Sequence, residues 1–172
     1  GASSNVCFVA GTLVETKSGQ KEIEQIQPGD MVLSWDEETE SFKYKEVVET
    51  YVNETDNLIL ISIGDEKIFV TPLHPFYLSG KGWVAAKDIN CGDYIKTAVG
   101  DKEKVQSIKH LKLSSPITVY NFQVADYHTY CIGESQLIVH NSCAHQSSSW
   151  KQIKSNYWKE QAQIGGNDTW YE

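Results

Sequence analysis

Long apolar runs, clusters of basic residues and paired cysteine motifs are all missing from this chain of 172 residues. No apolar run approaches 18 residues, so the sequence predicts no membrane-spanning helix. The formal net charge is −8 and the pI is near 5.1, whereas a nucleic-acid surface needs clustered Lys and Arg. We therefore expect neither a membrane nor a nucleic acid as a partner. The opening GASSNV lacks the charged and apolar segments of a signal peptide, and the sequence does not indicate a compartment.

The cysteines of this chain do not form a metal-binding pattern. The four residues are Cys7, Cys91, Cys131 and Cys143, and none belongs to a C-x-x-C pair. Their spacings do not match those of zinc ligands, so we expect no metal site. One disulfide remains an alternative. We favour buried free thiols at Cys91 and Cys131, because both lie in apolar, strand-like surroundings.

The hydrophobic pattern is that of many short strands. Hydrophobic residues make up 40% of the chain, enough for a core, and its length fits one domain of roughly 130–150 residues with a tail. Only Ala86–Ile89 looks like a helical turn before Ser142, so the sequence predicts an all-β fold. The expected strands are Thr12–Thr16, Lys21–Ile26, Met31–Trp35, Tyr44–Val52, Leu58–Ile63, Lys67–Thr71, Pro75–Leu78, Tyr94–Thr97, Lys104–Leu113, Thr118–Val124, Thr129–Ile132 and Gln136–Val139.

An internal repeat supports this prediction. The motif I-x-x-G-D at residues 26–30 recurs at residues 89–93, an offset of 63 residues, and Gly19 maps onto Gly82 at the same offset. Each copy reads as a strand, a glycine turn, a short helical piece, a Gly-Asp turn and a second strand. Coincidence among common turn residues is the alternative. We interpret the repeat as a duplicated β unit with pseudo-two-fold symmetry.

The composition changes after Asn141. Residues 142–149 are small and polar, and residues 150–163 show the periodicity of an amphipathic helix that Ser149 could cap. Such a helix could dock on the β domain. We favour a fragment of a different domain, because the pattern breaks off at Glu172.

A cysteine near the start of the chain, Cys7, is the candidate nucleophile. Its thiol can attack the carbonyl of Val6 through a five-membered ring and convert the peptide bond into a thioester. An amide is more stable, so the fold must shift this equilibrium by strain or by stabilising the oxyanion. Downstream, Thr71 could donate to that oxyanion and His74 could protonate the departing nitrogen. The alternatives are a buried structural cysteine and an ordinary turn histidine.

A second reactive group stands at the other edge of the predicted β domain, where Asn141 follows a buried-looking strand. The side-chain nitrogen of Asn141 can attack its own carbonyl, form a succinimide and release Ser142. His140 could protonate the leaving amine, and His128 could activate the Asn141 amide or the oxyanion. A reactive group at each edge of a folded block is what a self-excising protein needs.

In this order and spacing, the residues resemble the Hint superfamily of inteins, bacterial intein-like domains and Hedgehog autoprocessing domains. The similarity covers about Cys7 to Ser142. The opening and the compact size most resemble bacterial intein-like domains, which are found before toxin modules in secreted polymorphic proteins. The blocks that carry the resemblance are CFVAGT (7–12) with QPGD (27–30), TPLHPF (71–76), VYNFQV (119–124) with HTY (128–130), and LIVHNS (137–142).

The resemblance implies a flat, horseshoe-shaped all-β fold made of two related halves. It also implies autocatalytic splicing or cleavage in cis, with no cofactor and with the chain's own flanks as partners of a monomer. The expected divisions are an N-terminal flank at 1–6, an autoprocessing domain at 7–141, and a C-terminal flank at 142–172 that could begin a toxin module.

Two residues decide how far such a reaction proceeds. Ser142 is the candidate acceptor of the acyl group from Cys7, but a hydroxyl is a weaker nucleophile than a thiolate, so water or an external thiol could intercept the thioester. Inteins often carry Asp where Asn121 stands, and that Asp helps to couple the two cleavages. Because Asn is neither an acid nor a base, Asn121 is given an accessory role only.

Two other functions stay open at this point. A degenerate Hint module could serve as a rigid spacer between toxin parts, although the intact set of reactive residues argues against it. A Hedgehog-like module could pass the acyl group to a non-protein nucleophile. Such modules lack a C-terminal splice junction, so the residues 140–142 count against that alternative.

Overall fold

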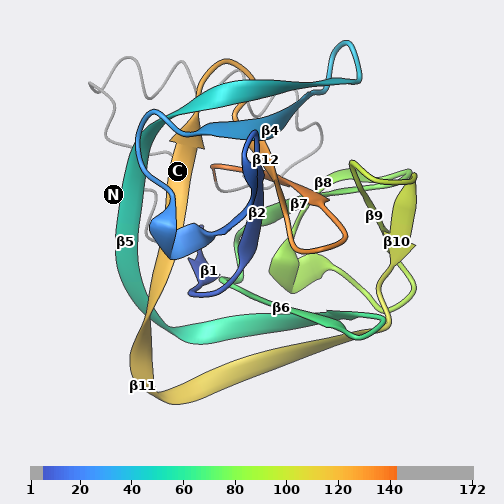
Figure 1. Ribbon diagram of the computed structural model, residues 1–172. Helices are drawn as coiled ribbons and strands as arrows, with labels where there is room; N and C mark the ends of the chain where they lie inside the picture. Colours follow the sequence, from blue (N-terminus) through green and yellow to red (C-terminus); the bar gives the residue numbers. More distant parts are fainter. Residues whose placement is uncertain (1–5, 143–172) are drawn as a thin grey trace, which may run out of the picture.

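The computed structural model describes residues 6–142, and within this range it contains thirteen β-strands and two short 3₁₀ turns (Figure 1). The predicted all-β fold is therefore confirmed. Residues 143–172, which include the expected helix at 150–163, lie outside the described range. The elements are β1 (Phe8–Val9), β2 (Leu13–Thr16), β3 (Gly19–Glu22), η2 (Ile23–Gln25), β4 (Met31–Asp36), β5 (Ser41–Ile63), β6 (Glu66–Val70), β7 (Pro75–Leu78), β8 (Gly82–Ala85), η3 (Ala86–Asp88), β9 (Tyr94–Lys96), β10 (Lys102–Lys104), β11 (Ser107–Val124), β12 (Thr129–Ile132) and β13 (Leu137–His140).

Two long strands frame the molecule. β5 and β11 pair antiparallel from Ser107↔Ser62 to Val124↔Val47, and they bend together along two sides of the fold in Figure 1. The prediction of four separate strands here was wrong, because each pair of expected strands forms one continuous strand. The expected gaps at 53–57 and 114–117 lie inside β5 and β11, which continue through them with a register shift between Lys112 and Ile117. A bulge of this kind bends a strand without ending it.

The predicted repeat is present in the backbone. In both copies the Gly N–H donates to a carbonyl of a later segment, the Asp carboxylate accepts from the N–H three residues before it, and a Lys pairs with that carboxylate. The first copy has Gly29 N to Val47 O (2.9 Å), Gln27 N to Asp30 Oδ2 (2.9 Å) and Lys21 Nζ to Asp30 Oδ2 (2.9 Å), and the second has Gly92 N to Val105 O (2.8 Å), Asn90 N to Asp93 Oδ2 (2.8 Å) and Lys81 Nζ to Asp93 Oδ1 (2.7 Å).

The repeat extends to the turn that carries His74. The His74 N–H donates to the Thr71 carbonyl at 3.3 Å, and the Thr12 N–H donates to the Val9 carbonyl at 3.3 Å in the other copy. The two copies thus share one turn geometry. Only the second copy carries the Thr-x-x-His side chains, so Thr71 and His74 have no counterpart of the same kind in the first copy.

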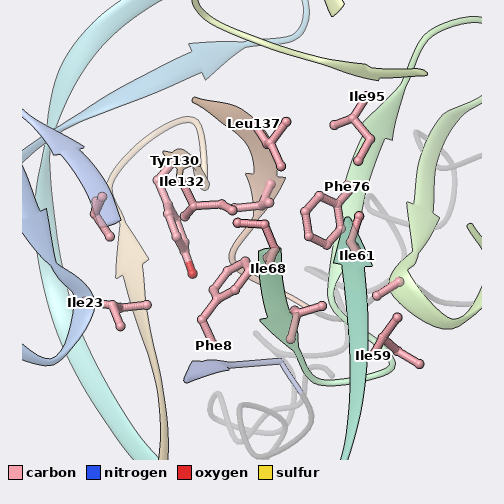
Figure 2. Packing of buried hydrophobic residues seen from close by; sticks show 14 of the residues in the cluster. Phe8, Ile23, Ile59, Ile61, Ile68, Phe76, Ile95, Tyr130, Ile132 and Leu137 are labelled. Carbon is pink, nitrogen blue, oxygen red and sulfur yellow. The ribbon is translucent and has the colours of Figure 1, made fainter. Parts of the chain in front are cut away.

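The core lies where the two halves meet, and Figure 2 shows aromatic and aliphatic side chains from many strands converging there. Every residue of β12 and β13 is buried, which explains why these strands are mostly apolar instead of alternating, with Thr129 and His140 as their polar ends. A fully buried Phe, Leu or Ile side chain contributes roughly 1.5–3 kcal/mol. This packing fixes the β12–β13 hairpin, and Asn141 follows directly after its second strand.

Several smaller expectations need correction. Cys131 is a buried free thiol as predicted, but Cys91 is an exposed free thiol, because it lies in the Gly-Asp turn of the second repeat instead of in a strand. The segment expected as a strand at Lys21–Ile26 contains the 3₁₀ turn η2. The short strands β1, β8 and β10 were missed. No helix in the described part of the chain is long and apolar enough to cross a membrane.

Candidate functional site

Cys7 is held by Thr71 at the N-terminal junction. Phe8 pairs with Val70 of β6, and Thr71 follows β6 directly, so the pairing brings the two residues together. The Thr71 hydroxyl accepts the Cys7 N–H at 2.8 Å and donates to the Cys7 carbonyl at 3.2 Å, while the Thr71 N–H donates to the same carbonyl at 3.0 Å. The sequence suggested a contact with the Val6 oxyanion. In the structure the Thr71 hydroxyl instead accepts a hydrogen bond from the nitrogen of the Val6–Cys7 bond.

The Cys7 thiol is fully buried and protonated at neutral pH. Burial raises its pKa to about 12, and hydrogen bonds from Asn53 and from the backbone of Val6 lower it by less. The Asn53 side-chain nitrogen lies 3.8 Å from Sγ and is the side-chain donor to the sulfur. Nothing in the sequence singled out Asn53, a polar residue in the middle of β5.

His74 lies between the two junctions. Its ring is completely buried, 4.3 Å from the Phe8 ring between centroids. Burial lowers its pKa to about 3, and backbone groups of His140 and Cys7 oppose this only in part. Neither ring nitrogen makes a hydrogen bond of normal geometry to the described residues. His74 is therefore a neutral imidazole that lies close to backbone atoms of Cys7 and His140.

His140 and Ser142 are in direct contact at the C-terminal junction. The Ser142 N–H donates to His140 Nδ1 at 3.1 Å, so the imidazole already touches the nitrogen that would leave. Asn141 and Ser142 are both 7% exposed. The Asn141 Nδ2 is buried and has no hydrogen-bond partner in the described part of the chain. Within residues 6–142, the nitrogen that would attack is thus not held by another group.

His128 contributes through its backbone as well as its ring. It adopts a left-handed conformation with φ of 60°, which is uncommon for a residue other than glycine, and its carbonyl accepts the Asn141 N–H at 2.9 Å. Its ring lies 6.4 Å from the His140 ring between centroids, at an interplanar angle of 30°. The Trp83 ring packs edge-on against the His140 ring, with 5.1 Å between their centroids.

Asn121 and Tyr130 complete the junction. The Asn121 Nδ2 donates to the main-chain carbonyl of Asn141 at 3.1 Å, and the Tyr130 hydroxyl donates to Asn121 Oδ1 at 2.7 Å. Both residues are at most 2% exposed. The sequence indicated Asn121 only as an accessory residue, and it gave Tyr130 no role.

The predicted site residues fall into two groups that share one region. Cys7, Thr71 and His74 form the first, and the second consists of Asn121, His128, His140, Asn141 and Ser142. The backbone contacts of His74 join the two. Within residues 6–142 no three His, Cys, Asp or Glu side chains gather as they would around a metal ion.

Comparison with known proteins identifies the family. The pretoxin HINT domain model matches residues 13–142, whereas a comparison with curated proteins finds no significant match. The solution structure of the bacterial intein-like domain from Clostridium thermocellum is 41% identical, with a TM-score of 0.76 over 78% of this chain and 98% of that one.

Two inteins share the fold at lower identity. The gp41-1 intein is 23% identical, with a TM-score of 0.64 over 80% of this chain and 100% of that one. The DnaB intein from Synechocystis sp. PCC 6803 is 16% identical, with a TM-score of 0.67 over 79% of this chain and 99% of that one. The chain belongs to the pretoxin HINT domain family, within the Hint superfamily of inteins and bacterial intein-like domains.

Proposed function

We propose that residues 7–141 form an autoprocessing domain that breaks the peptide bonds at both of its ends, using only its own side chains. Residues 1–6 and 142–172 are then the flanks. The observation that carries this proposal is the arrangement at the C-terminal junction. A carbonyl already bound by Asn121 lies beside a leaving nitrogen already bound by His140, and no group among the described residues holds the attacking Asn141 nitrogen.

The N-terminal step exchanges an amide for a thioester. Cys7 Sγ attacks the Val6 carbonyl carbon, a C–S bond forms, and the C–N bond to Cys7 breaks. The thiol proton must leave sulfur and reach the departing nitrogen, because a thiol with a pKa of about 12 is scarcely ionised at neutral pH. Neutral His74 can accept this proton and deliver it to nitrogen. Thr71 holds that nitrogen in place through its hydroxyl.

The C-terminal step is a cyclisation. Asn141 Nδ2 attacks the Asn141 carbonyl carbon, a C–N bond forms to close the succinimide, and the bond to Ser142 breaks. One proton passes from Nδ2 to the Ser142 nitrogen, and His140 Nδ1 is in contact with the atom that receives it. The carbonyl oxygen becomes an oxyanion on the way, and Asn121 already donates to it. A donor of this kind is typically worth about 10²–10³ in rate.

Ligation requires a further transfer. If the Ser142 hydroxyl attacks the Val6 thioester, a C–O bond replaces the C–S bond and the hydroxyl proton returns to the Cys7 sulfur. After cyclisation, the freed Ser142 amine attacks the ester and joins Val6 to Ser142 through a peptide bond. Water or an external thiol would give cleavage without joining.

One contact favours cleavage as the second candidate outcome. The Ser142 hydroxyl lies 3.3 Å from Asn141 Oδ1, which directs it toward its own junction. A serine hydroxyl also needs a positioned base to attack a thioester. Ligation must therefore wait for this hydroxyl to turn toward the acyl group at Cys7.

Intact mass spectrometry of the purified chain over time, with and without an added thiol, tests the proposal. Cys7→Ala should block thioester formation and thiol-dependent release of residues 1–6, and Asn141→Ala should block release of residues 142–172. A product that joins both flanks establishes splicing, and separate flanks establish cleavage. An unchanged mass under all conditions would contradict autoprocessing and favour a spacer.

A further inference from the structure

Tyr130 is a buried polar residue that the proposed reaction does not use directly. It lies on β12 with no exposed surface, and Figure 2 shows its ring among the core side chains, with its oxygen on the side of Phe8. The Phe122 ring packs 4.1 Å from it between centroids. A phenylalanine would fill this apolar setting without a polar atom. The hydroxyl therefore calls for an explanation other than packing.

The Tyr130 hydroxyl completes the orientation that the Asn141 carbonyl demands of the Asn121 carboxamide. The Asn141 carbonyl can only accept a hydrogen bond, so Asn121 must present its Nδ2 to it. The opposite end, Oδ1, must then meet a donor, and the Tyr130 hydroxyl fills that place at 2.7 Å. In the flipped amide, Asn121 Oδ1 would face the Asn141 carbonyl oxygen, and two acceptors would meet without a proton between them. A donor at Oδ1 disfavours that flip.

We propose that Tyr130 is a positioning residue for Asn141 cyclisation, and that its hydroxyl holds the Asn121 carboxamide with an N–H on the carbonyl that becomes the oxyanion. This inference rests on the proposed autoprocessing function and deepens it. Tyr130 touches no reacting atom and acts through Asn121. An aspartate at position 121 would need no such orientation, since the two oxygens of a carboxylate are equivalent.

The phenol remains a donor throughout the reaction. Burial raises the pKa of Tyr130 well above its usual value, and a negative charge at Cys7 raises it further. The hydroxyl thus stays protonated even if the Cys7 sulfur carries charge during the first step. The chain of hydrogen bonds from Tyr130 through Asn121 to Asn141 also strengthens each bond by mutual polarisation as charge develops on the carbonyl oxygen.

The test compares full-length chains carrying Tyr130→Phe, Asn121→Ala or both, with Tyr44→Phe as the matched control, because Tyr44 is 39% exposed. The readouts are the rate of release of residues 142–172 and the rate of thiol-dependent release of residues 1–6. We expect Tyr130→Phe to lower the ratio of the first rate to the second about tenfold, since one neutral hydrogen bond is lost. Asn121→Ala should lower the first rate about 100-fold or more.

The double variant separates positioning from other roles. If Tyr130 acts through Asn121, Tyr130→Phe adds no further loss in the Asn121→Ala background. Multiplying losses in the double variant would overturn the proposal. So would an equal loss of both release rates in the single variant, which would indicate general damage to the fold.

A second measurement does not depend on cleavage. In the Cys7→Ala, Asn141→Ala chain, which cannot react, the side-chain amide protons of Asn121 should give one set of NMR signals that exchange slowly with water. Adding Tyr130→Phe should speed that exchange and shift the signals. Unchanged Asn121 signals would overturn the positioning role. An inactive parent chain whose Asn121 signals do respond would contradict the proposed function and leave the positioning inference standing.

Discussion

The side-chain nitrogen of Asn121 donates a 3.1 Å hydrogen bond to the main-chain carbonyl of Asn141. The same carbonyl carbon is the one that the Asn141 side chain would attack, so a donor is in place before any charge develops. Asn121 is neutral at every pH, which means that this donor cannot be lost by titration. An aspartate in its place would need a proton to do the same.

Exchanging this amide for a carboxyl should therefore make the C-terminal step depend on pH. In Asn121→Asp, an ionised carboxylate would face the carbonyl oxygen and repel the oxyanion, while the protonated form could donate to it. Burial raises the pKa of such an acid above the usual value of about 4. We expect release of residues 142–172 to be about 10–100-fold slower than in the parent at pH 7, and the deficit to shrink as pH falls. Rates measured from pH 4 to pH 8 in both chains check this, and parallel profiles would contradict it.

The contact between His140 and Ser142 predicts a selective loss. Nδ1 of His140 accepts from the leaving nitrogen, and proton transfer by a positioned side chain is typically worth about 10²–10⁴ in rate. His140→Gln should slow release of residues 142–172 by that factor. Thiol-dependent release of residues 1–6 should fall much less, because Cys7 and Thr71 keep their mutual hydrogen bonds. Quantifying both fragments by mass spectrometry decides the matter, and equal slowing of the two would count against a local role.

The candidate reactive residues could be proposed from the sequence because the chemistry restricts their type and their place. Only a nucleophile after a scissile bond and an asparagine before one can start the two steps, which singles out Cys7 and Asn141. Asn53 and Tyr130 could not be found this way. A polar residue in a strand and a tyrosine in an apolar strand are ordinary, and their significance comes from partners 46 residues and 9 residues away.

The same contrast holds for the fold. Gly-Asp turns and alternation predicted the all-β class and the repeat, since these features are local. The merging of four expected strands into β5 and β11 was not predicted, because it depends on pairing between segments far apart in the chain. Cys91 was misplaced for a related reason. Its apolar neighbours suggested burial, but the second copy of the repeat puts it on a turn, where its side chain is exposed.

The buried neutral His74 should make stability depend on pH. Its pKa is about 3 in the fold, below the ordinary value of 6.5, so the unfolded chain binds a proton between these values that the folded chain does not. The free energy of unfolding that this difference contributes is complete above about pH 6.5. It is lost as pH falls toward 3, at up to about 1.4 kcal/mol per pH unit for one proton. In the unreactive Cys7→Ala, Asn141→Ala chain, urea unfolding at pH 7, 6 and 5 should show this decline. Adding His74→Gln should flatten it, and an unaltered slope would mean that other groups cause it.

The duplicated Asp turns offer a matched pair for measuring what the repeat contributes. Asp30 and Asp93 each accept a backbone N–H and pair with a lysine, and the pKa of each is lowered by these partners despite the opposing effect of burial. Their side chains differ in exposure, at 28% for Asp30 and 11% for Asp93. Because a less exposed amide is harder to satisfy with water, Asp93→Asn should destabilise the fold more than Asp30→Asn, by about 2 kcal/mol against about 1 kcal/mol. Urea unfolding of the unreactive chain at pH 7 measures both values.

Repeating the urea unfolding at pH 3 should shrink both differences, since stability that depends on a lowered carboxyl pKa is lost as pH falls through that value. A larger cost at Asp30, or costs that do not change with pH, would show that the carboxylates do not hold these turns as their hydrogen bonds indicate.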